Sequence, residues 1–191
     1  MSRGRLSTLK YYLPVLRRQS EDCLYLNLYV PDADSSTEKV AYPVVVYVHG
    51  ESYEWGSASL YDGSVLAALG RLIVVTINYR LGILGFFNPN VDPLGRATVA
   101  NYGLMDQLAA LHWVQENIVR FGGDPGHVTV MGHGTGAACL NFLVISPAAA
   151  ECVYVEPIKR WSDLSWVVDQ RHFNELLKLN KQITGNVEAK L

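Results

Sequence analysis

The sequence predicts an α/β fold built on a mostly parallel sheet with flanking helices. Two continuous runs of mainly β-branched residues, 43–48 and 72–79, have the composition of strands buried on both faces of a parallel sheet. From Asn101 the apolar residues instead recur every three or four positions, as they do on one face of a helix. Strands that alternate with helices in this way form right-handed β-α-β units, whose strands lie parallel.

The elements before residue 100 follow from the same patterns. Residues 1–19 show no clean period and form an unassigned leader. The expected order is then a strand at 23–30, the buried strand at 43–48, a helix near 62–69, the buried strand at 72–79 and a turn-rich crossing at 82–87.

The second half of the chain leads to a sharp turn between a strand and a helix. The helix from Asn101 is stopped by the glycine-rich segment 121–125. A short β-rich run, 127–131, then enters a glycine-dense turn and leaves as a helix that extends to about Pro147. A strand, a tight glycine turn and a helix are the frame of the hydrolase nucleophile elbow, G-x-S-x-G. In this sequence the frame reads Gly132-His133-Gly134-Thr135-Gly136.

Composition excludes several classes of function. With 191 residues, 49% hydrophobic and 18% charged, the chain suits one globular domain or two small ones. Its net charge of -2 gives no footprint for nucleic acid or an anionic membrane. No apolar run is long enough for a membrane helix, and no secretory signal is visible. The cysteines, Cys23, Cys139 and Cys152, are too few for a disulfide framework and lack metal-ligand spacing. No cofactor is expected.

Four sequence blocks carry a resemblance to a known family. They are SEDCLYLN at 20–27, VHG at 48–50, NYRLG at 78–82, and NYGLMDQ at 101–107 with FGGDP at 121–125. In this order and spacing they resemble the type-B carboxylesterase and cholinesterase family of α/β-hydrolases. The segment YDGSVLAA at 61–68 and the missing elbow serine are most similar to the neuroligins, the adhesion branch of that family.

The resemblance covers residues 20–147 and implies a partial α/β-hydrolase fold, truncated after the elbow helix. Residues 148–191 then form a divergent, weakly helical tail with no strand able to continue the sheet. Cys23 matches a position that forms a disulfide in the family. Because no cysteine lies upstream of it, Cys23 is either free or paired elsewhere.

The resemblance implies a serine nucleophile at the centre of the elbow, where this chain has Gly134. Acyl-transfer hydrolysis needs a nucleophile, a base and oxyanion donors, so no acyl-enzyme can form through Gly134. The tight turn should aim the side chains of His133 and Thr135 away from the vacant place. Elbow centres have strained backbone angles that glycine accepts at little cost. Gly132 and Gly136 are then retained for the close approach of strand and helix.

The oxyanion loop departs from the family pattern as well. The family has His-Gly-Gly after the strand, and glycine there makes backbone N–H donors available. Here the loop is His49-Gly50-Glu51. The Glu51 carboxylate either opposes a developing oxyanion or points to solvent, and neither alternative improves the oxyanion hole. His49 is expected to support the end of the strand.

The acid and base of the family triad lie well downstream of the elbow. The acidic and histidine residues considered for these roles match no family motif; they are Glu151, Glu156, Asp163, Asp169 and His172. Structural roles suit the other polar residues: His112 and His127 pack or face solvent, Asn101 caps a helix, and Asp124-Pro125 forms a turn. Arg80 and Asp106 can form an internal ion pair.

Three interpretations of the function follow. The favoured one is a catalytically inactive esterase-like domain of neuroligin type, for cell adhesion or protein recognition. The alternatives are an active carboxylic-ester hydrolase with a displaced nucleophile, and a truncated product with no independent function. By resemblance, the expected partner is a neurexin-like cell-surface protein and the expected location is the cell surface or extracellular space. Neither nucleic-acid binding nor a membrane span in this chain is expected.

Overall fold

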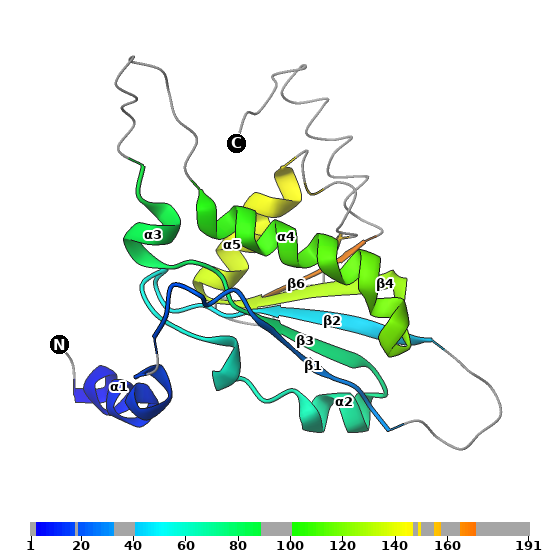
Figure 1. Ribbon diagram of the computed structural model, residues 1–191, viewed down its shortest axis with the longest axis horizontal. Helices are drawn as coiled ribbons and strands as arrows, with labels where there is room; N and C mark the ends of the chain where they lie inside the picture. Colours follow the sequence, from blue (N-terminus) through cyan, green and yellow to red (C-terminus); the bar gives the residue numbers. More distant parts are fainter. Residues whose placement is uncertain are drawn as a thin grey trace, which may run out of the picture.

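The computed structural model describes residues 3–17, 19–32, 41–88, 101–146, 149, 155–157 and 165–170. Their strands form one six-stranded sheet in the order β1-β3-β2-β4-β6-β5 (Figure 1). Two helices, α4 (Tyr102–Asn117) and α5 (Thr135–Ile145), pack over the central strands. The α/β class is therefore confirmed.

The centre of the sheet is parallel, as the sequence predicts. β2 (Tyr42–Val48) pairs in parallel with β3 (Ile73–Ile77) on one side and with β4 (Gly123–His133) on the other. β1 (Leu26–Tyr29), in contrast, runs antiparallel to β3 at the edge of the sheet. The sheet is thus mixed rather than mostly parallel.

The far edge of the sheet corrects the prediction for the tail. β6 (Ser165–Gln170) pairs antiparallel with β4, and β5 (Val155–Pro157) pairs antiparallel with β6. The segment SWVVDQ of β6 has the aromatic and β-branched residues that favour a strand, and it covers an otherwise unpaired edge of β4. The prediction that no strand follows the elbow helix is therefore wrong. The weak helix expected around Leu176, Leu177 and Ile183 lies outside the described residues.

The N-terminal segment also differs from the expectation. α1 (Arg3–Leu16) is a helix, although Pro14 lies in its last turn and the sequence shows no clean period there. Pro14 lacks the N–H that would bond to the carbonyl four residues earlier, but the turns that precede it keep their hydrogen bonds. α2 (Ser64–Gly70), α4 with η2 (Ile118–Phe121), and α5 form where the sequence predicts helices; η1 (Ala58–Leu60) and α3 (Gly82–Phe86) are short. In the described part of the chain, no helix combines the length and apolar character needed to cross a membrane.

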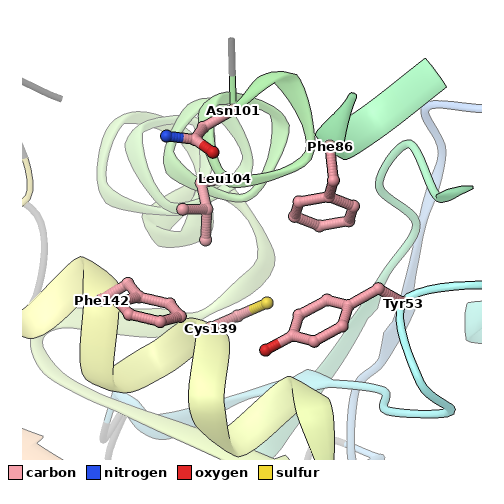
Figure 2. Close-up of a pocket in the computed structure, with 6 residues that line it drawn as sticks. All are labelled: Tyr53, Phe86, Asn101, Leu104, Cys139 and Phe142. Atoms are coloured by element: carbon pink, nitrogen blue, oxygen red, sulfur yellow. The ribbon is translucent and has the colours of Figure 1, made fainter. Parts of the chain in front are cut away.

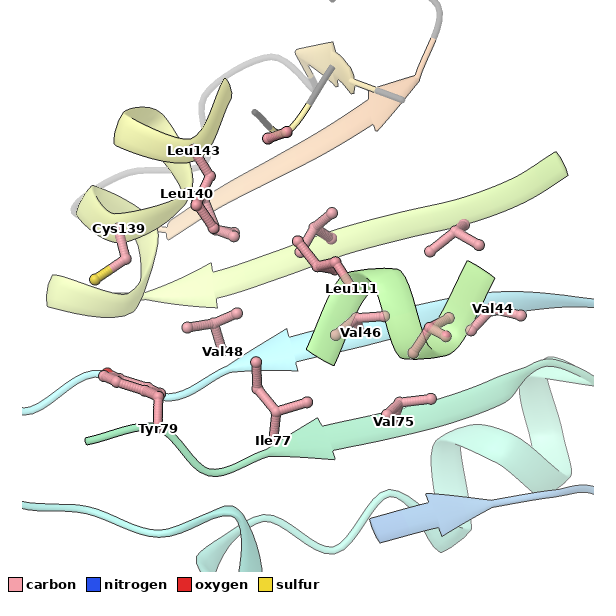
Figure 3. Packing of buried hydrophobic residues seen from close by; sticks show 14 of the residues in the cluster. Val44, Val46, Val48, Val75, Ile77, Tyr79, Leu111, Cys139, Leu140 and Leu143 are labelled. Atoms are coloured by element: carbon pink, nitrogen blue, oxygen red, sulfur yellow. The ribbon is translucent and has the colours of Figure 1, made fainter. Parts of the chain in front are cut away.

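The main core lies between one face of the sheet and helices α4 and α5 (Figure 3). Val44, Val46 and Val48 of β2 are fully buried and belong to one cluster with Leu111 of α4 and Leu140 of α5. The alternate positions of the strands face the other way: Tyr47 packs on Tyr61, with ring centroids 4.7 Å apart, and Val74 lies under Gly63 at the start of α2. The side chains of these continuous apolar runs therefore pack on both faces of the sheet.

The predicted ion pair between Arg80 and Asp106 is formed. Arg80 Nε and Nη2 each donate to one oxygen of Asp106 at 2.7 Å, and the Arg80 backbone N–H donates to the same carboxylate at 3.0 Å. Asp106 is 8% exposed on α4, so the pair fixes the segment after β3 to that helix. The carboxylate raises the pKa of Arg80 through these hydrogen bonds.

Candidate functional site

The predicted elbow is formed, with Gly134 at its centre. β4 ends at His133, α5 begins at Thr135, and Gly134 between them has φ 56° and ψ -122°. L-amino acids with a side chain rarely adopt this positive φ, whereas glycine does so at little cost, so the turn has the backbone conformation expected at an elbow centre. A Cβ built on Gly134 meets no atom within 4 Å. The turn therefore keeps open the place from which a side chain would project.

The two outer glycines of the elbow allow backbones to approach closely. A Cβ on Gly132 would lie 2.8 Å from the Ala137 nitrogen of α5. A Cβ on Gly136 would overlap the Val48 carbonyl oxygen and lie 2.6 Å from that of His49. The packing role predicted for both glycines is confirmed.

Neither residue next to Gly134 is placed to act as the nucleophile in place of the missing serine. His133 is exposed to solvent. The Thr135 hydroxyl oxygen is sealed from solvent and has no hydrogen-bond partner among the described residues. An attacking hydroxyl needs both access to the substrate and a base that accepts its proton, and neither is present at Thr135 in the described structure.

The oxyanion loop lies against the elbow, as the resemblance implies. A Cβ on Gly50 would overlap the His133 carbonyl oxygen and lie 3.1 Å from the Thr135 nitrogen. The next residue, Glu51, has φ 111°, and Ser52 and Tyr53 also have positive φ, 59° and 61°. The loop thus keeps a backbone shape suited to glycine although three successive residues carry side chains.

The Glu51 side chain is half-buried rather than pointing freely into solvent. Burial raises the pKa of Tyr61 and of Tyr47, and the Glu51 carboxylate raises both further. The negative charge of Glu51 therefore disfavours ionisation of the Tyr47 and Tyr61 hydroxyls.

Because Glu51 occupies a strained backbone region, Glu51→Gly should raise the free energy of unfolding by about 1 kcal/mol. Relief of backbone strain of roughly 1–3 kcal/mol outweighs the entropy that glycine adds to the unfolded chain, about 0.4–1 kcal/mol. Urea unfolding measures the difference. Glu51→Ala is the matched control, because it removes the carboxylate but retains Cβ and the strain. An equal gain in both variants would attribute the effect to charge and contradict the account.

His49 supports the loop from behind. The residue is 1% exposed. Its ring stacks on Tyr79 with centroids 4.6 Å apart and an interplanar angle of 23°, and the ring of Tyr61 lies at a longer distance from it. The Tyr79 hydroxyl donates a 2.6 Å hydrogen bond to the His49 carbonyl oxygen. Burial lowers the pKa of His49 and so favours the neutral form of the ring. The predicted role of His49 at the strand end is confirmed.

A cavity of about 230 Å³ lies beside the elbow helix; its lining residues are Tyr53, Phe86, Asn101, Leu104, Cys139 and Phe142 (Figure 2). The side chains of Tyr53 and Cys139 both extend into this space. Burial raises the pKa of the Cys139 thiol. A protonated, buried thiol is a weak nucleophile, so the cavity offers apolar space rather than a reactive group.

The remaining candidate residues are dispersed. Cys23 and Cys139 are free thiols, whereas Cys152 lies outside the described residues. Glu156 lies on β5 and Asp169 on β6; Glu151, Asp163 and His172 lie outside the described residues. His127 is on the surface, where its Nδ1 is 2.6 Å from Asp124. Among the described residues, no three His, Cys, Asp or Glu side chains gather as metal ligands.

Sequence reasoning missed the aromatic support of the loop. Tyr61 and Tyr79 flank His49, and Tyr53 has positive φ. Tyr79 stands inside the NYRLG block, so its place in a family motif was the available signal. Tyr61 comes from a separate segment, and no spacing in the sequence links it to His49.

The mixed sheet and the elbow define part of an α/β-hydrolase fold. A solved structure of a thermophilic pNB esterase matches 88% of this chain and 34% of its own, with a TM-score of 0.65 and 39% identity. The carboxylesterase family model matches residues 3–156, and the chain belongs to that family.

Curated relatives include both branches considered from the sequence. Neuroligin-2 of Mus musculus is 47% identical over 148 residues, which cover 69% of this chain and 17% of that protein. Liver carboxylesterase of Sus scrofa is 53% identical over 130 residues, which cover 68% of this chain and 22% of that protein. The chain thus spans about a fifth of the length of the curated relatives it matches. The resemblance to the family is confirmed, and relatives of both kinds are present.

Proposed function

We propose that this chain is a catalytically inactive member of the carboxylesterase family that serves in protein recognition. The observation that carries the proposal is the elbow itself: its backbone retains the strained turn, while Gly134 contributes no hydroxyl. Glu51 in the oxyanion loop is a second, independent departure that supports it, because a carboxylate near the loop disfavours a developing negative charge.

The proposed biological role is cell adhesion of the neuroligin kind. It rests on the similarity to neuroligin-2 together with the missing nucleophile. A neurexin-like cell-surface protein is the proposed partner, and the cell surface or extracellular space is the proposed location. Surface plasmon resonance against a neurexin ectodomain tests this part, and failure to bind would remove the partner while leaving the catalytic proposal intact.

An active ester hydrolase is the second candidate, favoured by the 53% identity to a liver carboxylesterase. It requires a nucleophile other than Gly134. Thr135 is the nearest hydroxyl in sequence, but its oxygen is sealed from solvent. Because substrate has no access to the Thr135 hydroxyl, an active hydrolase is the weaker candidate.

Hydrolysis of a nitrophenyl ester tests the inactive assignment. The wild-type chain should not exceed the rate of buffer, and Gly134→Ser should restore no sustained turnover, because a serine hydroxyl without a positioned base is a poor nucleophile. A side chain fits at Gly134, and the strain should cost about 1–3 kcal/mol of stability. Gly134→Ala is the control for that strain. Wild-type turnover that survives in Gly134→Ala would contradict the proposal.

A further inference from the structure

The charges of the chain are strongly segregated, although their sum is small. Residues 1–20 contain five Lys or Arg and no Asp or Glu, whereas the rest of the chain has 11 basic and 18 acidic residues. Most of the basic segment is α1, which protrudes at the edge of the molecule, away from the sheet (Figure 1). The net charge of -2 therefore conceals a basic helix beside an acidic body.

One side of α1 rests on the body of the protein. Tyr12 is only partly exposed, and its ring lies 6.2 Å from that of Trp55. The contact leaves much of the helix surface free.

The free surface combines leucines with cations. Leu6 and Leu13 are 46% and 50% exposed, and the seven-residue separation, about two turns, places them on one line of the helix. Lys10 and Arg17 are also exposed, and each follows one of these leucines by four residues. Positions i and i+4 are neighbours on a helix surface, so Lys10 lies beside Leu6, whereas Arg17 lies in the turn that directly follows the last residue of α1.

We propose that α1 docks this protein onto an anionic lipid surface. Leu6 and Leu13 enter the boundary between headgroups and acyl chains, and Lys10 and Arg17 contact the lipid phosphates. Interfacial helices have this combination, in which apolar side chains insert and long basic side chains extend to the headgroups. The exposed leucines favour a lipid surface over a soluble polyanion, because a polyanion offers them no apolar environment. The helix lies on the surface and does not span it.

Vesicle sedimentation of the full chain tests the proposal. The protein should pellet with vesicles of phosphatidylcholine mixed with phosphatidylserine, and not with phosphatidylcholine alone. Lys10→Gln with Arg17→Gln should lower the partition coefficient roughly 30-fold, from about 5-fold for each cation lost near an anionic surface. Leu6→Ser with Leu13→Ser should lower it roughly 10-fold, because half-exposed leucines lose their transfer into an apolar environment. Arg120→Gln, which removes an exposed charge on η2, should leave it unchanged.

Two results would overturn the proposal. One is equal binding of the wild type and the Lys10/Arg17 double variant. The other is full vesicle binding by the leucine double variant together with complete competition by heparin, which would assign the basic helix to a soluble polyanion. Circular dichroism of each variant checks that the fold is retained. If the leucine variant unfolds, the charge variants and the comparison of the two lipid compositions still test the proposal.

Discussion

Gly136→Ala is expected to lower the free energy of unfolding by more than about 3 kcal/mol, which is the upper range for overpacking a buried site. The new methyl group would overlap the Val48 carbonyl oxygen and approach that of His49 to 2.6 Å. Both are backbone atoms of the central strand and its end, so neither can rotate aside. Relief requires α5 to move away from the sheet, which opens the core around Leu140.

Urea unfolding of purified variants measures this effect. Gly134→Ala is the matched control, two residues earlier in the same turn. Its Cβ meets no atom within 4 Å, so only backbone strain of about 1–3 kcal/mol is expected. A smaller loss for Gly136→Ala than for Gly134→Ala would show that the helix is not seated on the strand end as described.

Asp106→Ala should lower the free energy of unfolding by about 2–3 kcal/mol. The change removes both oxygens that accept from the Arg80 guanidinium and backbone N–H. Losing one partner of a buried ion pair costs about 3–5 kcal/mol. The expected value is lower because the Arg80 side chain is 37% exposed and water replaces part of the interaction.

The chain offers an exposed carboxylate for comparison. Asp124 lies 2.6 Å from His127, but their side chains are 35% and 70% exposed. Asp124→Ala should therefore lower the free energy of unfolding by less than about 1 kcal/mol. Equal losses at Asp106 and Asp124, measured by thermal or urea unfolding, would contradict the view that the buried pair ties the segment after β3 to α4.

The sequence was sufficient to predict the centre of the fold. β2 and β3 are continuous β-branched runs, and α4 has a clear helical period, so burial and periodicity agree with local propensity. The elbow was predicted from the spacing of its glycines. Its positive φ at Gly134 follows from the turn that joins strand and helix directly.

The rest depends on tertiary contacts that a pattern does not encode. The composition of β6 favours a strand, but its place in the sheet depends on the edge of β4 with which it pairs. α1 has no clean period but packs through Tyr12 on Trp55. The positive φ at Glu51 was missed because nothing in its residue type favours it; the loop holds that shape where it passes the elbow, with Gly50 against His133.

The elbow separates scaffold from chemistry. Gly132 and Gly136 preserve the close contacts that hold strand, turn and helix together, and those contacts need no nucleophile. A family member can therefore keep this architecture for recognition after losing its hydroxyl. On this account, the side chain at position 134 governs reactivity, while the neighbouring glycines govern stability.

The most direct measurement is intact-mass spectrometry of the wild-type chain after incubation with a fluorophosphonate, which traps activated serine and threonine hydroxyls. Because Gly134 has no hydroxyl and that of Thr135 is sealed, the mass should stay that of the unmodified protein. A stoichiometric phosphonyl adduct on any residue would reveal an activated nucleophile and contradict the inactive assignment.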